Sequence, residues 1–231
     1  MTEVQVWWGR ADQALAAHVE LFSEVERDRH ARFRVASARD QFTVGCAIVR
    51  LVLAELTGIA PGKLELDREC TRCAGPHGKP RLVGSDLRFS VSHSGDRIGV
   101  AFGTGVELGL DVERAEGRDR DGVADAVLTP AELAGWRALP EADRDAAFYT
   151  YWTRKESVVK ATGDGLNAPM AELHVSGPGE PARLLTYPGA LALDATMADL
   201  DPGPGYAAAL TVLGPLTSVT THDAGALLAA V

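Results

Sequence analysis

The chain has 231 residues, of which 46% are hydrophobic and 24% charged, and its formal net charge is -9. This composition suffices for one sizeable core or two small ones and excludes a wholly disordered chain. The acidic balance argues against a protein that coats nucleic acid, which normally presents a basic surface. No stretch of about 18 apolar residues occurs, nor an initial run of signal-peptide length, so we expect a cytoplasmic protein without a membrane span.

Two helical patterns follow a first strand in the N-terminal part of the chain. Residues 4–8 read as a strand, and residues 11–26 place apolar side chains at steps of three and four, which predicts a helix. Residues 38–56 show the same pattern and end at Gly58, a residue type that commonly terminates helices. We therefore expect one strand and two helices before the Gly- and Pro-rich loop that follows.

Strand patterns occupy the middle of the chain. Residues 87–93 and 97–103 are separated by the turn sequence SGD, which predicts a β-hairpin. Residues 106–113 form a third strand pattern after a short glycine turn. The elements indicate an α+β fold, and the glycine turn suggests two subdomains, residues 1–105 and 106–231.

Capping residues mark the helices of the second half. Thr129 and Glu132 have the spacing of a capping box, with Pro130 at the first helical position. A long helical pattern over residues 141–162 is closed by Gly163. Four or five short strand patterns then follow, separated by Gly/Pro turns.

The strand over residues 106–113 carries the first candidates for chemistry. Its apolar residues alternate onto one face, so Asp111 and Glu113 point together from the other face. Adjacent carboxylates repel each other unless a cation or solvent lies between them. The pair indicates either a solvated strand face or a site for Mg²⁺, which prefers carboxylate and phosphate oxygens. Gly109, without a side chain, would let another backbone or a ligand approach.

Two polar segments are suited to phosphate. Ser92 and His93 lie at a strand end before a turn, where a hydroxyl, an imidazole and backbone N–H groups can bind a phosphate. They point to opposite faces of the strand, so they do not form a catalytic dyad. Lys79, between a glycine and a proline, supplies a point charge that can bind phosphate. The structural alternatives are polar turn residues and a solvated lysine.

The helix over residues 141–162 aligns Trp152, Glu156 and Lys160 on one stripe. An exposed Glu-Lys pair at this spacing contributes only about 0.3–0.5 kcal/mol. The tryptophan indicates a stripe that is partly covered, where a carboxylate and a lysine need partners. The stripe is therefore either a surface ion pair or half of an active site.

Four ordered motifs resemble the 4′-phosphopantetheinyl transferases of the larger, single-chain type that activates surfactin synthetase. They are G-K-P at residues 78–80, S-H-S at 92–94, LGLDVE at 108–113 and W-x-x-K-E-S-x-x-K at 152–160. This family moves the phosphopantetheine arm of coenzyme A to a serine of an apo acyl or peptidyl carrier protein and releases 3′,5′-ADP. The resemblance implies two similar α+β subdomains in a pseudo-twofold arrangement with the active site at their interface. The first would bind coenzyme A phosphates, and the second would hold the metal site and the catalytic helix.

The resemblance also implies roles for single residues in this chain. Asp111, Glu113 and Glu156 would bind Mg²⁺, with Mn²⁺ as an alternative ion. Asp111, Glu156 and Lys160 would be catalytic, with Lys160 at the α-phosphate side of the pyrophosphate. The proton of the carrier serine would go to Glu156 or to a bound water, and both options stay open. Lys155 faces another side of the helix, about 100° away, and is expected to have a supporting role.

Coenzyme A would be held by six residues under the same resemblance, and these are Arg39, Arg50, Lys79, Ser92, His93 and Lys160. Among them, His93 and the two arginines would lie nearest the 3′-phosphate. The arginine that binds this phosphate stays open among Arg29, Arg32, Arg34 and Arg39.

Other enzyme classes and partners also stay open. The same carboxylates would suit a Mg²⁺-dependent phosphohydrolase or nucleotidyl transferase, and a non-catalytic coenzyme A- or nucleotide-binding module is a third option. Cys70 and Cys73, with His77, resemble half of a zinc site or are plain loop thiols, whereas Cys46 is expected in the core. The expected partners are coenzyme A and carrier proteins of fatty-acid, polyketide or peptide synthesis, with no nucleic acid and no membrane. We expect a monomer.

Overall fold

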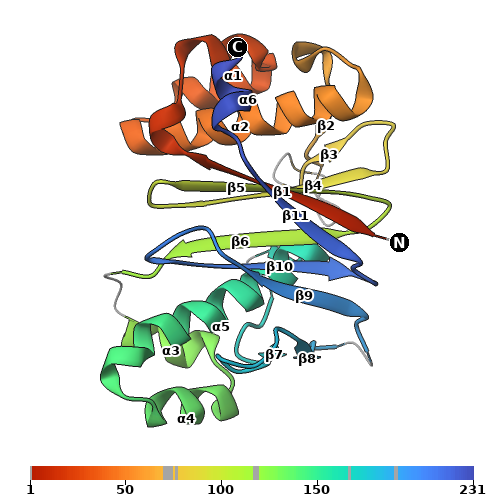
Figure 1. Cartoon of the computed structure of the whole chain (residues 1–231). Helices are drawn as coiled ribbons and strands as arrows, with labels where there is room; N and C mark the ends of the chain where they lie inside the picture. The colour runs from red at the N-terminus through yellow and green to blue at the C-terminus, as the bar shows by residue number, and fades with distance from the viewer. Residues whose placement is uncertain (1, 70–74, 76–77, 117–119, 166–167, 190–191) are drawn as a thin grey trace. The chain divides into compact units, whose positions relative to one another are not determined.

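The computed structural model describes residues 2–69, 75, 78–116, 120–165, 168–189 and 192–231. Helices and strands are mixed along the chain (Figure 1), which confirms the α+β class. The chain forms two compact units: an N-terminal unit, Glu3–Gly105 with Val219–Val231, and a central unit that consists mainly of Val106–Ser218. The C-terminal segment therefore differs from the expected division, because it packs with the first unit. No described helix combines the length and the apolar character needed to cross a membrane.

The N-terminal unit is built on a four-stranded sheet. Its strand order is β11–β1–β5–β4, with β1 at Glu3–Arg10, β4 at Leu87–Ser94, β5 at Arg97–Thr104 and β11 at Ser218–Asp223. Both β1 and β4 pair antiparallel with β5. The β4–β5 turn contains Gly95 in the left-handed region, with a φ of 57°. The predicted first strand and the predicted hairpin are confirmed.

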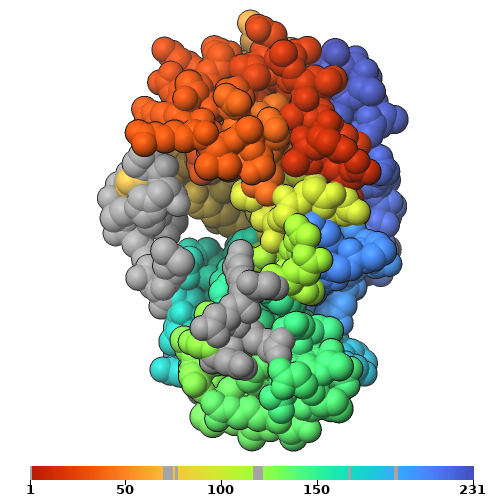
Figure 2. All heavy atoms as spheres, turned by 90° about the vertical axis from the view of Figure 1, so that its left-hand side faces the viewer, coloured from red at the N-terminus to blue at the C-terminus, as the bar shows by residue number. Residues whose placement is uncertain are grey.

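Helix α2 (Ala36–Thr57) lies across this sheet and supplies much of the unit's core (Figure 1). It ends at Gly58, whose φ of 72° makes the predicted left-handed cap. The smaller elements of the unit are the 3-10 helix Pro61–Lys63, β2 (Leu66–Asp67), β3 (Arg81–Leu82) and α6 (Gly225–Ala229). Helix α6 contacts α2, and Figure 2 shows the blue C-terminal residues beside the red and orange N-terminal ones.

The prediction of a single helix over residues 11–26 is wrong. The structure has 3-10 helices at Ala11–Gln13 and Ala16–Leu21, followed by α1 at Glu24–Ala31. Helix α1 starts there because Ser23 and Glu26 form a capping box, in which each side chain bonds the other residue's backbone N–H. The apolar residues keep their helical spacing on both sides of Ser23, so the pattern predicted one continuous helix and not a new helix that begins at this capping box.

The central unit packs a second long helix on a three-stranded antiparallel sheet. The sheet has the order β6–β10–β9, with β6 at Leu108–Arg114, β9 at Ala195–Leu200 and β10 at Tyr206–Leu213. Helix α5 (Glu141–Thr162) lies on β6 and β10 (Figure 1). It ends at the predicted cap, Gly163, with a φ of 81°.

Shorter elements surround α5 on the side away from its sheet. These are α3 (Arg120–Val127), α4 (Pro130–Ala138), β7 (His174–Val175) and β8 (Leu184–Thr186). The predicted capping box of α4 is confirmed, because Thr129 accepts from the Glu132 N–H and the Glu132 side chain accepts from the Thr129 N–H. Helices α3, α4 and α5 share a buried apolar cluster that includes Trp136 and Phe148.

Candidate active site

Two predicted residues that are far apart in the sequence meet between β6 and α5. The Lys160 Nζ atom donates a hydrogen bond to the Asp111 Oδ1 atom at 2.7 Å. The Asp111 side chain is 5% exposed and the Lys160 side chain 29% exposed. Trp152 on the same stripe of α5 is partly buried, and its ring lies 5.9 Å from that of Phe148. The stripe is therefore partly covered, and its lysine does not form a simple surface pair with Glu156.

The close approach expected at Gly109 is made by the backbone of α5. A Cβ atom on Gly109 would lie 2.0 Å from the Ser157 carbonyl oxygen and 2.4 Å from the Ala161 nitrogen. Thr211, the partner of Gly109 on β10, shares a 2.7 Å hydrogen bond with the Ser157 hydroxyl. Because Gly109 has no side chain, α5 rests directly on the strand that carries Asp111.

Glu156 lies within the electric field of the other predicted carboxylates. Burial raises the pKa of Glu156 most, the negative charges of Asp111 and Glu113 raise it further, and the positive charge of Lys160 opposes them. Glu156 and Glu113 are both half-buried. The central unit thus has three carboxylates and one ammonium group whose charges act on one another, with negative charge in excess.

The three carboxylates Asp111, Glu113 and Glu156 are chemically suited to a hard divalent cation. Carboxylate oxygens are the ligands that Mg²⁺ prefers, and a cation would offset the repulsion that raises the pKa of Glu156. Within the described ranges, however, no three His, Cys, Asp or Glu side chains are gathered closely enough to hold an ion. One oxygen of Asp111 is instead bonded to Lys160. The residues fit Mg²⁺ by their chemistry, and the metal site stays a prediction.

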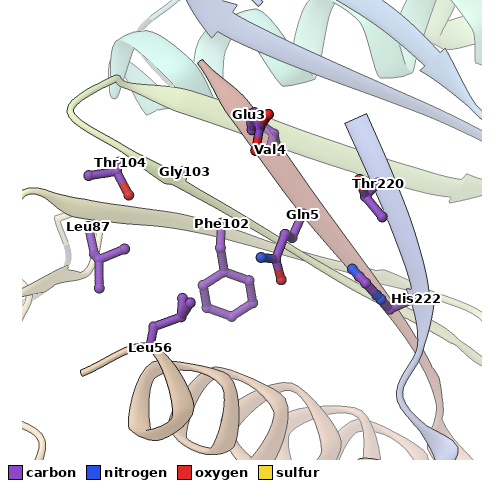
Figure 3. A pocket seen from close by; sticks show the side chains of 10 residues that line it. All are labelled: Glu3, Val4, Gln5, Leu56, Leu87, Phe102, Gly103, Thr104, Thr220 and His222. Atoms are coloured by element: carbon purple, nitrogen blue, oxygen red, sulfur yellow. The ribbon is translucent and has the colours of Figure 1, made fainter. Parts of the chain in front are cut away.

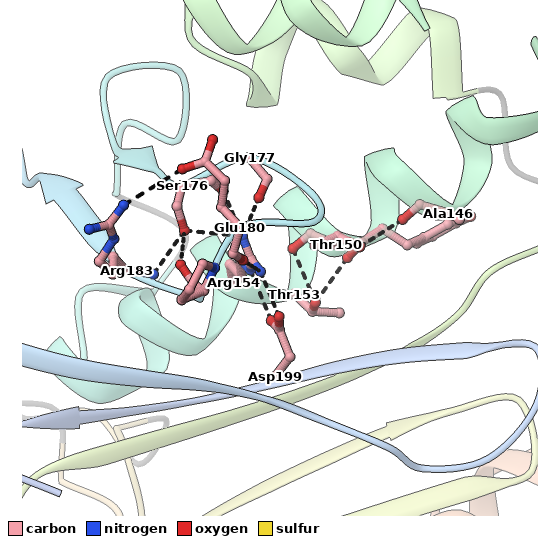
Figure 4. A network of polar contacts seen from close by, with 11 residues as sticks. Ala146, Thr150, Thr153, Arg154, Ser176, Gly177, Glu180, Arg183 and Asp199 are labelled. Atoms are coloured by element: carbon pink, nitrogen blue, oxygen red, sulfur yellow. Dashed lines mark hydrogen bonds and ion pairs between the residues drawn. The ribbon is translucent and has the colours of Figure 1, made fainter. Parts of the chain in front are cut away.

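Two fully buried cations precede Glu156 on α5. The Arg154 guanidinium pairs with Asp199 at 2.9 and 2.5 Å and donates to the carbonyl oxygens of Ser176, Gly177 and Glu180 (Figure 4). The Lys155 ammonium forms an ion pair with Glu132 at 2.6 Å. Burial lowers the pKa of Lys155, and the hydrogen bond and charge of Glu132 oppose this shift.

The N-terminal unit places Arg39 and His93 at the same end of its sheet. The Gln41 side chain donates to the Gly95 carbonyl oxygen at 2.7 Å, which brings the start of α2 beside the β4–β5 turn. His93 pairs with Ile98, so it shares the sheet face that α2 covers, and it is exposed. Ser92 points to the opposite face and is 5% exposed.

The Arg50 side chain is enclosed by the protein and is not accessible to a ligand. Its side chain is fully buried and pairs with Glu26 at 2.6 Å. It also donates to the carbonyl oxygens of Pro61 and Leu64. Its charge is therefore used inside the N-terminal unit, and the expectation that it contacts the 3′-phosphate is withdrawn. The apolar stripe of α2 could not reveal this pairing, because Glu26 belongs to another helix.

The sequence interpretation missed Arg68 as a candidate for anion binding. Burial lowers the pKa of Arg68 most and the positive charge of Arg29 lowers it further, whereas the negative charge of Glu26 opposes these shifts. The Arg29 guanidinium also lies 5.3 Å from the centre of the Phe42 ring on α2. An anion between two such cations would relieve their repulsion. No motif marks Arg68 in the sequence, because its interaction with Arg29 arises from the fold.

Replacing the two arginines of α2 should give opposite results. Arg50→Met should lower the free energy of unfolding by about 3–5 kcal/mol, because it leaves the Glu26 carboxylate buried without its partner. Arg39→Met should leave stability nearly unchanged, because Arg39 is exposed. Urea denaturation measures both values. A wild-type stability for Arg50→Met would contradict the structural role.

The described part of the N-terminal unit also contains a cavity of about 330 Å³. Leu56 of α2, Phe102 of β5, Gln5 of β1 and His222 of β11 are among the residues that line it (Figure 3). Its lining also includes Leu87 and Thr104, which pair at the end of the hairpin away from the Gly95 turn. The cavity contains none of the predicted site residues and is not part of the candidate active site.

The cysteines separate into two groups. Cys46 is buried, as expected, and burial raises the pKa of its thiol to about 12. Cys70, Cys73 and His77 lie outside the described residues, so the proposed half of a zinc site stays a prediction.

Comparison with known proteins identifies the class of protein to which this chain belongs. The sequence model of the 4′-phosphopantetheinyl transferase superfamily matches residues 107–211, which include the four candidate residues of the central unit. The 4′-phosphopantetheinyl transferase HetI of Nostoc sp. is 32% identical over 221 residues, which cover 92% of this chain and 88% of that protein. The chain therefore belongs to the 4′-phosphopantetheinyl transferase superfamily. This finding confirms the resemblance carried by the four motifs, and with it the enzyme class.

Two further similar proteins have a lower identity to this chain than HetI. The 4′-phosphopantetheinyl transferase Sfp of Bacillus subtilis is 25% identical over 159 residues, which cover 68% of this chain and 67% of that protein. The crystal structure of Thermotoga maritima holo-[acyl-carrier-protein] synthase is 21% identical, with a TM-score of 0.39, over 47% of this chain and 64% of that chain. HetI and Sfp place this chain with the larger, single-chain transferases.

Proposed function

We propose that the protein transfers 4′-phosphopantetheine from coenzyme A to a serine of an apo carrier protein in a Mg²⁺-dependent reaction. The serine oxygen forms a bond to the phosphorus that bears pantetheine, the bond from that phosphorus to the bridging oxygen breaks, and 3′,5′-ADP leaves. The observation that carries the proposal is the Asp111–Lys160 pair beside Glu156, within the segment that matches the superfamily.

The side chains of the central unit would divide the work of phosphoryl transfer. Asp111, Glu113 and Glu156 would hold Mg²⁺, or Mn²⁺ in its place. When bound, the ion stabilises the charge that develops on the phosphoryl oxygens and on the leaving phosphate. Lys160, kept in place by Asp111, would bind the α-phosphate side of the pyrophosphate and add a second positive charge there.

Glu156 has a second role open to it, as the group that accepts the serine proton. Burial raises its pKa, which makes its carboxylate a stronger base, whereas binding to a metal weakens it and favours a water as the base. Glu156→Gln separates these roles. If Glu156 accepts the proton, the variant should stay inactive at every Mg²⁺ concentration, and if Glu156 only holds the ion, a high Mg²⁺ concentration should restore much of the rate. Transfer rates measured across a Mg²⁺ titration decide between them.

The N-terminal unit would bind the phosphates of coenzyme A. We assign the 3′-phosphate to the end of the sheet that carries Arg39 and His93, with Arg29 and Arg68 as the second candidate pair. Lys79 and Ser92 remain proposed phosphate ligands.

The proposal includes a monomer in which two similar subdomains meet in a pseudo-twofold arrangement around the active site. The carrier stays open among those of fatty-acid, polyketide and peptide synthesis.

Removing one phosphate contact should weaken coenzyme A binding without affecting stability. Arg39→Met should raise the KM for coenzyme A about tenfold, because a charge-assisted hydrogen bond contributes about 1.5–3 kcal/mol. Steady-state transfer at varied coenzyme A concentration measures this change, with dephospho-coenzyme A as the control substrate. An equal loss with both substrates would show that Arg39 does not contact the 3′-phosphate.

The proposed function is tested by incubation with coenzyme A, Mg²⁺ and apo carrier proteins of the acyl and peptidyl types. We expect the intact mass of the carrier to increase by one phosphopantetheine, with release of 3′,5′-ADP, and we expect EDTA to stop the reaction. Several carriers without an adduct would overturn the proposal. Coenzyme A cleavage without any carrier would indicate the phosphohydrolase class instead, and binding without turnover a coenzyme A-binding module.

A further inference from the structure

Lys155 directly precedes Glu156 on α5 but points to a different side of the helix. Successive residues of an α-helix are about 100° apart. The Lys155 side chain is 0% exposed, and its Nζ atom lies 2.6 Å from Glu132 Oε2. The same atom donates to the carbonyl oxygens of Val127 at 2.7 Å and Met170 at 2.9 Å. All three protons of the ammonium group can therefore be used within the central unit.

Glu132 is held as firmly as its partner. Its Oε2 atom accepts from the Thr129 N–H at 2.8 Å, inside the capping box of α4. Its Oε1 atom accepts from the Val175 N–H on β7 at 3.0 Å. The Lys155–Glu132 pair thus connects one point of α5 to the end of α3, the start of α4, β7 and the chain after α5.

Arg154 holds α5 from another direction. It binds Asp199 on β9 and the carbonyl oxygens of the segment before β8 (Figure 4). Two consecutive buried cations therefore fix the helix at two angular positions. The next residue, Glu156, lies within the electric field of Asp111, and Lys160, one turn further along the helix, bonds Asp111 directly. The backbone contact at Gly109 sets how deeply the helix rests on its sheet.

We propose that Lys155 is a positioning residue, which fixes the rotation of α5 about its axis and so aims Glu156 and Lys160 at Asp111. This inference rests on the proposed transferase function. A helix with its side chains has a radius of about 5–6 Å, so a rotation of about 10° moves a side-chain end by about 1 Å. A displacement of that size at a catalytic group can lower a rate about 10²-fold.

Two other roles for Lys155 agree less well with its contacts. Direct binding of a phosphate would require an accessible ammonium, whereas this one is fully buried and has three acceptors. A purely stabilising role is poorly served by a buried ion pair, because well-packed apolar residues are often as stabilising or more so. Fixing one orientation of α5 requires directed contacts, which the ammonium group makes and an apolar side chain would not.

The test compares Lys155→Met with the double variant Lys155→Met/Glu132→Gln in the full-length protein. The single variant leaves the Glu132 charge buried and should melt at a lower temperature, whereas the double variant removes both charges and should recover part of the loss. Lys63→Met, the same change at an exposed lysine of the N-terminal unit, is the control. Transfer is measured per folded molecule, well below each melting temperature.

If Lys155 positions α5, both Lys155 variants should transfer about 10–100-fold more slowly, with the KM for the carrier unchanged. The Mg²⁺ concentration at half-maximal rate should rise about tenfold, as for other residues that orient metal ligands. Electron paramagnetic resonance should show about tenfold weaker Mn²⁺ binding to the complex with coenzyme A, in the absence of a carrier. Lys63→Met should change none of these values.

A folded Lys155 variant with the wild-type rate and the wild-type metal dependence would overturn the inference and leave the pair a structural one. If Lys155→Met does not fold, the double variant alone decides by the same measurements. Failure of the unchanged protein to modify any carrier is a different result, because it overturns the proposed function itself and the inference with it.

Discussion

Asp111→Asn should lower the rate of phosphopantetheine transfer about 10²–10³-fold while the protein stays folded. The amide keeps the size of the side chain but removes the charge that pairs with Lys160 and that would bind Mg²⁺. Charge stabilisation by a metal in phosphoryl transfer amounts to several kcal/mol, and each 1.36 kcal/mol changes a rate tenfold. Transfer to an apo carrier measures the rate, and circular dichroism verifies the fold.

The control for this prediction is Asp125→Asn, an identical chemical change on the exposed surface of α3. Asp125 pairs with Arg137 between two exposed side chains, and exposed pairs contribute little. The control should therefore keep the wild-type rate and stability. If Asp111→Asn keeps the wild-type rate, Asp111 neither binds the metal nor positions Lys160 for the reaction.

Gly109→Ala should affect both the fold and the reaction. The added methyl group would lie 2.0 Å from the Ser157 carbonyl oxygen and 2.4 Å from the Ala161 nitrogen, so α5 must move away from β6. Backbone atoms cannot rotate aside as a flexible side chain does, and we expect a loss of about 1–3 kcal/mol or more in the free energy of unfolding. The folded fraction should also transfer phosphopantetheine at least about 10²-fold more slowly, because Glu156 and Lys160 move with the helix.

Gly135→Ala is the matched control, made in the exposed part of α4. Nothing lies within 4 Å of a Cβ atom at this position. Alanine favours a helix over glycine by about 0.5–1 kcal/mol, so this variant should be more stable than the wild type. Urea denaturation of both variants gives the comparison. Equal stability of Gly109→Ala and the wild type would contradict the close backbone contact.

Local signals predicted most of the elements. The hairpin around Gly95, the cap at Gly58 and the capping box at Thr129 each depend on a few neighbouring residues, and the structure has all three. The helix expected over residues 11–26 failed for a related reason. Its apolar spacing extended across Ser23, where a second capping box starts a separate helix.

The site was predictable where one element determines the geometry, and less so where several elements meet. Strand alternation was enough to expect Asp111 and Glu113 on one face, and the position of Glu156 beside them came with the family resemblance. Burial of Arg50 depends on Glu26 from another helix, and the contacts of Lys155 come from three separate segments. Such long-range pairings leave no periodic pattern in the sequence.

The return of the C-terminal segment to the first sheet has a consequence for synthesis on the ribosome. β11 is the neighbour of β1 in the sheet, the Ala224 N–H donates to the Trp8 carbonyl oxygen, and the buried His18 side chain bonds the Leu228 carbonyl oxygen. The first strand thus keeps one edge unpaired until the last segment has been translated, although the central unit can form earlier. During that interval the nascent chain presents an open strand edge, the kind of surface that aggregates or recruits chaperones.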